Sequence, residues 1–126
     1  MNFPNNLKYT REHEWLREEG AEAVIGITDF AQKELGDIVY IDIDTEGETL
    51  TAGEKYGTIE AVKTVSDLFM PVGGTVISVN PILESTPDMA NKDPYGEGWL
   101  IRINITEPDE FNGLMTAAVY EASCTK

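Results

Sequence analysis

Lys63 is the residue whose type and position most directly suggest chemistry. Residues 58–61 and 65–70 are rich in β-branched and apolar side chains, and Val62-Lys63-Thr64 joins them, so the segment predicts a hairpin with the lysine at its tip. Most lysines are exposed and do no chemistry, so a solvated lysine is the plain interpretation. Two features favour a role: basic residues number only 9, and small or β-branched neighbours stiffen the backbone and leave the amine unobstructed.

A second candidate is the cluster of His13 and Glu14 beside Trp15, since a histidine and a carboxylate can act as a general acid and base. The chain has one histidine and one cysteine, Cys124, far apart in sequence, so neither a catalytic triad nor a metal site can be assembled from them. A structural role for the pair is the better interpretation. The loop Gly96-Glu97-Gly98 lacks the strand–GxxxxGK–helix context of a phosphate loop, and its glycines are expected to allow a close approach beside Trp99. Nothing here predicts an autonomous enzyme.

Length and composition predict a single globular domain over residues 1–126. The chain has 9 basic and 23 acidic residues and a formal net charge of −14. This charge should repel nucleic acid and anionic membranes and should favour partners with basic faces, although a need for solubility explains it equally well. Both nucleic acid and membranes are therefore predicted to be absent from its partners.

Cysteine usage and the first residues bear on location. A sole cysteine permits no internal disulfide, which is typical of a reducing compartment. No apolar run approaches membrane-spanning length, and residues 1–6 resemble neither a signal peptide nor a transit segment. We expect a cytoplasmic monomer, although a mature mitochondrial form would look the same.

Many short strands separated by turns must position these residues, a pattern that favours a sandwich or barrel. Residues 21–27 alternate and predict a strand with one buried face, and Val39, Ile41 and Ile43 predict the inner face of another strand. Further strands are expected at residues 7–9, 13–17, 75–79 and 99–104, with surface turns at 18–20, 45–54 and 71–74, and mostly irregular chain at 82–98 with one turn of helix near Leu83.

Three short helices are predicted from capping signals. Asp29 is expected to cap the first, with Gln32 three residues on, and Gly36 to end it. Thr106-Glu107-Pro108-Asp109 predicts the start of a second helix, and Thr116 the cap of a third that runs to about Ser123.

The lysine-tipped hairpin, the Pro71-Val72-Gly73-Gly74 turn and the strand after it resemble the lipoyl-attachment region of carrier domains. The run from Glu60 to Asp67 resembles, in particular, the H proteins of the glycine cleavage system. Four other blocks resemble motifs of that family in the same order: Tyr9-Thr10 with His13-Glu14-Trp15, residues 26–32 with 35–39, Ser66-Asp67 with residues 71–74, and Asn91 with residues 94–100.

The resemblance implies a mainly β, lipoyl-domain-like fold, a barrel-sandwich hybrid of two antiparallel sheets with short helices, one at the C-terminus. It implies a non-catalytic carrier with lipoic acid bound as an amide to Lys63 by a lipoyl-attaching enzyme. In the implied cycle, glycine decarboxylase transfers an aminomethyl group onto one sulfur as the disulfide opens. An aminomethyltransferase passes the one-carbon unit to tetrahydrofolate with release of ammonia, and dihydrolipoamide dehydrogenase reoxidises the dithiol.

The family also implies a cleft that shelters the loaded arm, near Glu14 and the Ser66-Asp67 side of the hairpin. Glu14 and Asp67 are the expected partners of the ammonium group on the arm. The chain departs from the family pattern at Glu12, where many members have a small polar residue, and at Met70, which is often polar. Glu12 either tightens the hold on a cationic arm or crowds it.

Four alternatives compete with the glycine carrier. A lipoyl domain of a 2-oxoacid dehydrogenase acyltransferase is usually shorter and lacks the blocks around Trp15 and Trp99. A biotin carrier has methionines beside its lysine, where this chain has Val62 and Thr64. An H-like protein acting mainly as a lipoyl relay for other enzymes, and an unmodified interaction domain, both stay open.

Overall fold

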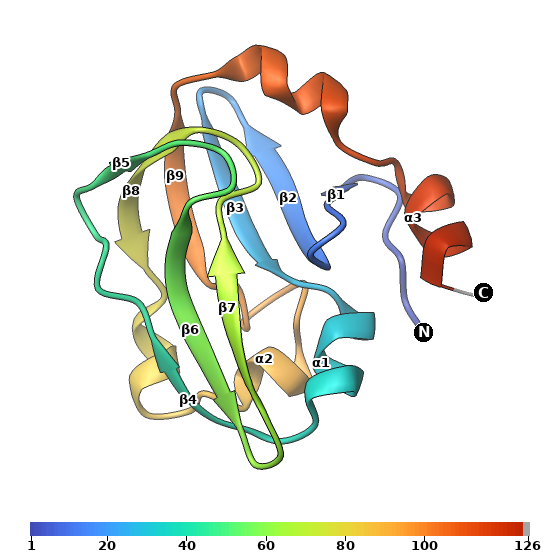
Figure 1. Cartoon of the computed structure of the whole chain (residues 1–126), viewed down its shortest axis with the longest axis vertical. Helices are drawn as coiled ribbons and strands as arrows, with labels where there is room; N and C mark the ends of the chain where they lie inside the picture. Colours follow the sequence, from blue (N-terminus) through green and yellow to red (C-terminus); the bar gives the residue numbers. More distant parts are fainter. Residues whose placement is uncertain (125–126) are drawn as a thin grey trace.

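The computed structural model describes residues 1–124 and consists of two antiparallel sheets with short helices, as the sequence predicts (Figure 1). The larger sheet has the strand order β1-β2-β3-β9-β8-β5, and the smaller has the order β4-β6-β7. The strands are β1 (Lys8–Tyr9), β2 (Glu14–Glu19), β3 (Glu22–Ile27), β4 (Ile38–Asp42), β5 (Thr49–Leu50), β6 (Lys55–Ala61), β7 (Val65–Phe69), β8 (Gly74–Val79) and β9 (Ile101–Ile105).

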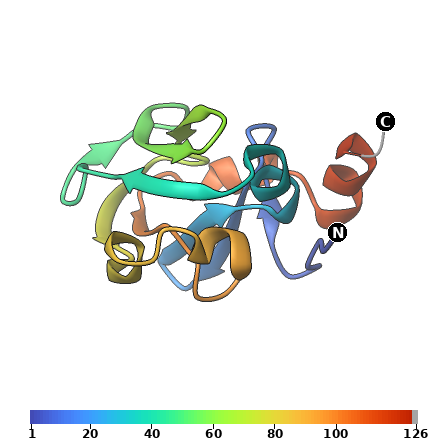
Figure 2. The same cartoon turned by 90° about the horizontal axis from the view of Figure 1, so that it is seen from below.

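The main core lies between the two sheets, which form separate layers in Figure 2. Inward-facing apolar residues of both sheets meet there, among them Ile25, Ile59, Val76 and Ile103, all essentially inaccessible to water. Strand alternation puts these side chains on one face of each sheet, and their burial is the main source of stability. The sandwich is therefore the frame that carries the hairpin of β6 and β7.

Strand β3 is buried on both faces, whereas its sequence predicted one buried face. Ala23, Ile25 and Ile27 face the main core, but Val24 and Gly26 are buried as well. A second apolar cluster, of Leu7, Tyr9, Trp15, Val24, Ala117 and Tyr120, covers the outer face of the larger sheet. The prediction failed because the covering helix comes from the far end of the chain.

The helices are α1 (Asp29–Leu35), α2 (Met89–Lys92) and α3 (Ala117–Cys124), with 3-10 turns η1 (Pro81–Glu84) and η2 (Pro108–Gly113). The cap of α1 is Thr28 rather than the predicted Asp29: its Oγ1 accepts a hydrogen bond from Ala31 N at 3.1 Å. Asp29 is the first helical residue, and its Oδ1 accepts from Gln32 Nε2 at 2.7 Å. Gly36 ends α1 with φ 76°, as predicted.

The inner face predicted for residues 37–44 is wrong at Val39. Ile38 is buried instead, while Val39 is 54% and Tyr40 53% exposed. The pairing of β4 with β6 shifts between Ile38 and Tyr40, which marks a β-bulge. An extra residue in a bulge breaks the alternation, so simple periodicity fails after it.

Two smaller expectations also change. The region expected to form only surface turns contains the short strand β5, although Gly47 and Gly53 do lie in turns with positive φ. The expected helix after Thr106 is the 3-10 turn η2, and no side chain caps it. Gly96 and Gly98, beside Trp99 in the chain, do allow a close approach, at Asp93 and at the backbone of Met89 and Ala90. Thr116 does support α3, through a bond from Val119 N at 3.4 Å.

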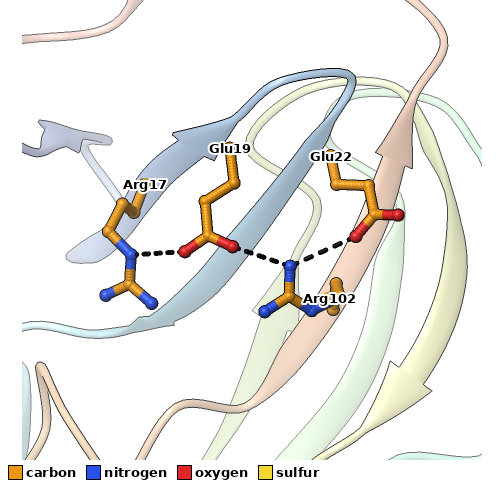
Figure 3. A network of polar contacts seen from close by, with 4 residues as sticks. All are labelled: Arg17, Glu19, Glu22 and Arg102. Carbon is orange, nitrogen blue, oxygen red and sulfur yellow. Dashed lines mark hydrogen bonds and ion pairs between the residues drawn. The ribbon is translucent and has the colours of Figure 1, made fainter.

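A charged network joins β2, β3 and β9 at the end of the molecule opposite the hairpin tip (Figures 1 and 3). Arg102 donates from Nη1 to Glu19 at 2.8 Å and to Glu22 at 3.1 Å, and Arg17 donates from Nε to Glu19 at 2.9 Å. The bonds from Arg102 and Arg17 lower the pKa of the Glu19 carboxyl. Exposed pairs contribute little singly, so this network acts mainly to fix the register of the three strands.

In residues 1–124, no helix has the length and apolar character needed to cross a membrane.

Gly26 supports a direct test of the outer cluster. It lies opposite Trp15 in the β2–β3 pair, and a Cβ at this position would sit 2.6 Å from the indole Cε2. We expect Gly26→Ala to lower the free energy of unfolding by about 1–3 kcal/mol in urea denaturation, because the added carbon displaces a packed ring. Gly113→Ala is the control, since a Cβ there meets nothing within 4 Å. Equal stability of the two variants would contradict the packing described.

Candidate functional site

Lys63 is exposed and lies in the bend between β6 and β7. Figure 1 shows this bend at the lower end of the molecule. The two strands pair up to Glu60 and Val65, and the turn is closed by a bond from Ala61 N to Thr64 O at 2.8 Å. Within residues 1–124, the amine has no hydrogen-bond or ion-pair partner. The primary amine is therefore free for covalent chemistry.

The hairpin tip rests on the connection between α1 and β4. Val62 N donates to the carbonyl of Asp37 at 2.9 Å, which fixes the backbone next to the lysine. The lysine stem passes over Gly36, where a Cβ would lie 3.2 Å from Lys63 Cε. Gly36 thus supplies both the positive φ that ends α1 and the space that the lysine stem occupies.

Asn91 of α2 holds that connection from the other side. Its Nδ2 donates to Gly36 O at 2.8 Å and to Gln32 Oε1 at 3.1 Å, and its Oδ1 accepts from Ile38 N at 2.9 Å. One amide side chain therefore fixes the backbone on both sides of Asp37, which carries the tip. Sequence reasoning found Asn91 only as part of a family block and gave it no role, since its partners are far away in the chain.

Glu14 is buried, with 1% exposure, between the two sheets. Its Oε1 accepts from the Tyr56 hydroxyl at 2.8 Å, and its Oε2 accepts from Phe69 N at 2.9 Å. Burial raises the pKa of Glu14 to about 8, against the lowering effect of these two bonds. At neutral pH the carboxyl is mostly protonated and links β2 to β6 and β7.

A groove of about 640 Å³ lies beside Glu14, between the β1–β2 turn, the end of β7 and the segment before α3. Thr10, Arg11, Glu12 and Phe69 line it, so the structure brings Glu12 to this groove together with the cationic Arg11. Ser66 and Asp67 are not part of its lining and lie on exposed positions of β7. Asp67 forms an exposed ion pair with Lys55 at 3.3 Å.

His13 occupies the β1–β2 turn with φ 65°, a left-handed conformation that is uncommon outside glycine. Its Nδ1 lies 2.8 Å from the Tyr120 hydroxyl, which in turn lies 2.7 Å from Thr28 Oγ1. Its ring packs against Phe30 with centroids 4.6 Å apart. These contacts tie the turn to α1 and α3. In residues 1–124, no group of three or more histidine, cysteine or acidic residues is placed to hold a metal ion.

Comparisons with known proteins agree with one another. The family model described as "Glycine cleavage H-protein" matches residues 7–126. The "Glycine cleavage system H protein" of Bacteroides fragilis is 60% identical over 97% of this chain and 97% of its own length, and that of Salinibacter ruber is 53% identical over 95% and 97%. The crystal structure of a glycine cleavage system H protein from Mycobacterium marinum matches with a TM-score of 0.84 and 37% identity, covering 95% of this chain and 97% of that one.

The support given by Asn91 can be tested at the hairpin tip. Asn91→Ala leaves Ile38 N and Gly36 O without their partner, so we expect a loss of about 1–3 kcal/mol in unfolding free energy. We also expect faster hydrogen exchange of the Val62 amide than in the parent, because its acceptor Asp37 lies in the released segment. Asn112→Ala, an exposed substitution in η2, should change neither quantity. An unchanged Val62 exchange rate in the Asn91 variant would show that the clamp does not hold the tip.

The raised pKa of Glu14 gives a pH-dependent prediction. Between its ordinary pKa of 4.5 and the folded value of about 8, the folded protein keeps a proton that the unfolded chain releases. Stability from this group therefore falls as pH rises through that interval. Glu14→Gln cannot titrate, so the stability of the parent relative to this variant should fall from pH 5 to pH 8, by about 1.4 kcal/mol for each pH unit crossed. Denaturation midpoints at several pH values measure this, and parallel curves would refute it.

Proposed function

Since the chain belongs to the glycine cleavage H-protein family, we propose that Lys63 is the residue that carries its lipoyl group. The chain is a lipoyl carrier of the glycine cleavage system and a component without catalytic activity of its own. The family and the names of its relatives imply that it carries lipoate. What we propose beyond this is the residue to which the lipoyl group is attached and the individual enzymes that the chain meets.

The exposed, unpartnered amine of Lys63 at the tip of a fixed hairpin is the observation that supports attachment most strongly. The residues present fit an amide-linked group: the nitrogen is accessible, and the stem lies over a glycine rather than against a side chain. Val62 N, bonded to Asp37 O, keeps the backbone beside the amine in place. An attaching enzyme therefore meets one defined loop, with little conformational entropy to lose on binding.

A bound lipoyl group supplies a disulfide that opens to accept a one-carbon unit and is later reoxidised. The work of the chain itself is to tether and to present. On the order of ten bonds, each with a projected length of roughly 1.2 Å, separate the backbone from the end of such an arm, which gives it a sweep of more than about 10 Å. Ser66 and Asp67 follow Lys63 by three and four residues, which puts their backbones at most roughly 10 and 13 Å from that of Lys63. Both lie at the distance that the arm can reach.

Asp67 and Ser66 are thus the proposed first contacts of a cationic arm, with Glu12 contributing negative charge in the groove. Asp67 would have to exchange its exposed pairing with Lys55 for the arm, which costs little because such pairs are weak. Both carboxyl oxygens of Glu14 already accept hydrogen bonds. We therefore propose that Glu14 affects the arm indirectly, by holding Phe69 in position. A direct contact from Glu14 would require one of these bonds to open.

The proposed partners within the glycine cleavage system are glycine decarboxylase, an aminomethyltransferase and dihydrolipoamide dehydrogenase, together with the enzyme that attaches the lipoyl group. We further propose a single-domain monomer that acts in the cytoplasm. The acidic charge of the chain supports docking on basic partner faces.

Lys63→Arg tests the attachment directly. We expect the peptide spanning residue 63 to show the mass of one lipoyl group in the parent and none in the variant. Reconstituted exchange between glycine and bicarbonate with the decarboxylase should fall to background, because arginine forms no lipoyl amide. Lys55→Arg is the matched control, since Lys55 is also an exposed lysine of the same hairpin. A lipoyl group on Lys55, or exchange sustained by the Lys63 variant, would reject the proposal.

A further inference from the structure

The outer face of the three-stranded sheet carries an unusual group of exposed apolar side chains. Seven large apolar side chains are exposed in residues 1–124, and four of them lie at the hairpin end of this sheet: Val39 (54%), Tyr40 (53%), Val62 (74%) and Val65 (62%). The other three, Met1, Ile77 and Val119, lie on separate elements. We call Val39, Tyr40, Glu60, Val62 and Val65 the hairpin face.

The strand register makes the hairpin face continuous. Tyr40 of β4 is paired with Glu60 of β6, and Glu60 is paired with Val65 of β7. Residues directly opposite one another share a face of the sheet, so these three form a row about 10 Å across. Val62 follows in the turn next to Lys63. The row therefore lies within three residues of Lys63 on both strands of the hairpin.

The bulge in β4 is what exposes two consecutive large side chains. Without the shift between Ile38 and Tyr40, alternation would turn one of Val39 and Tyr40 inward. Bulges often re-aim side chains next to functional sites. In a chain as polar and acidic as this one, the exposure of an aromatic and three valines around one turn indicates a surface that another molecule covers.

The charges around these side chains indicate the kind of molecule. The carboxylates of Glu60 in the row and of Asp42, two pairs further along β4, have no ion-pair or hydrogen-bond partner within the described chain. Lys63 is the cation nearest to Glu60 in sequence, and amide formation removes its charge, while Lys55 of β6 is paired with Asp67. The face is thus apolar with unpaired carboxylates, which complements a protein surface that has an apolar centre and arginine or lysine side chains.

We propose that the hairpin face is the docking surface for the glycine decarboxylase that loads the Lys63 arm, by way of a basic, apolar patch beside the entrance to its active site. This inference rests on the proposed function, because it requires a loaded arm at Lys63. Contact at this row places the arm's origin against the partner, while the groove beside Glu12 lies elsewhere on the molecule. Asp67, a proposed first contact of the arm, lies two residues along β7 from Val65 and shares its face, so docking at this row also brings the partner next to Asp67.

Tyr40→Thr, made in the lipoylated protein, tests this proposal. Loading is first checked by mass, and glycine–bicarbonate exchange is then measured against carrier concentration with the decarboxylase. We expect the KM for the carrier to rise about tenfold with kcat nearly unchanged, as for the loss of a central tyrosine contact. Val65→Thr should raise it less, and Glu60→Gln should weaken the rise of KM with added salt.

Ile77→Thr is the matched control, because it removes an exposed apolar side chain from β8 of the other sheet. Its KM should equal that of the parent. A parent that is loaded and active, with unchanged KM in the Tyr40 and Val65 variants, would overturn the docking surface and leave the proposed function intact. A parent without loading or exchange would overturn both. Sedimentation that shows a parent dimer, dissociated by Tyr40→Thr, would instead assign this face to a second copy of the chain.

Discussion

A backbone hydrogen bond from Val62 N to the Asp37 carbonyl carries the support of the hairpin tip one residue beyond the β4–β6 pairing, which ends at Ile38 and Ala61. The bend itself lies outside the paired strands, so its position depends on this bond. Asp37 can provide it because Gly36 turns the chain at the end of α1 and Asn91 holds the residues on either side. The result is a fixed backbone with a free amine. Flexibility is confined to the side chain that needs it.

The link between the two sheets near the groove depends on a buried carboxyl. Glu14 joins β2 to the hairpin strands through Tyr56 and Phe69, and it is mostly neutral at pH 7 because burial raises its pKa. Apolar side chains would fill the same space with less cost in stability, since a buried polar group must keep all its partners. What the carboxyl adds is direction: it accepts from the outward N–H of an edge strand that would otherwise be unpaired. The position of β7, and with it that of Ser66 and Asp67, follows from this contact.

The sequence predicted those parts of the fold that depend on local pattern. Strand alternation and turn residues located the hairpin, the Pro71–Gly74 turn and most strands, and the fold class with its two antiparallel sheets is confirmed. The errors lie where distant parts of the chain meet. Val24 is buried by a helix that begins at Ala117, and the bonds of Glu14 reach 42 and 55 residues along the chain. The alternation of apolar and polar residues along a strand carries no information about such contacts. It also gave no sign of the one-residue bulge at Val39. Lys63 as the attachment point came from family resemblance, and its exposure is a structural finding.

A carrier that serves several enzymes must stay in solution when it is free, and it must associate with other proteins only through its docking surface. The acidic charge spread over this chain meets the first need, and it also weakens any contact between two copies through repulsion. The second need is met by a few apolar side chains confined to the hairpin face. The enzyme that docks there gains affinity from these side chains plus its own basic groups. Because the contacts are few, release stays fast, which suits a protein that must leave one enzyme to reach the next.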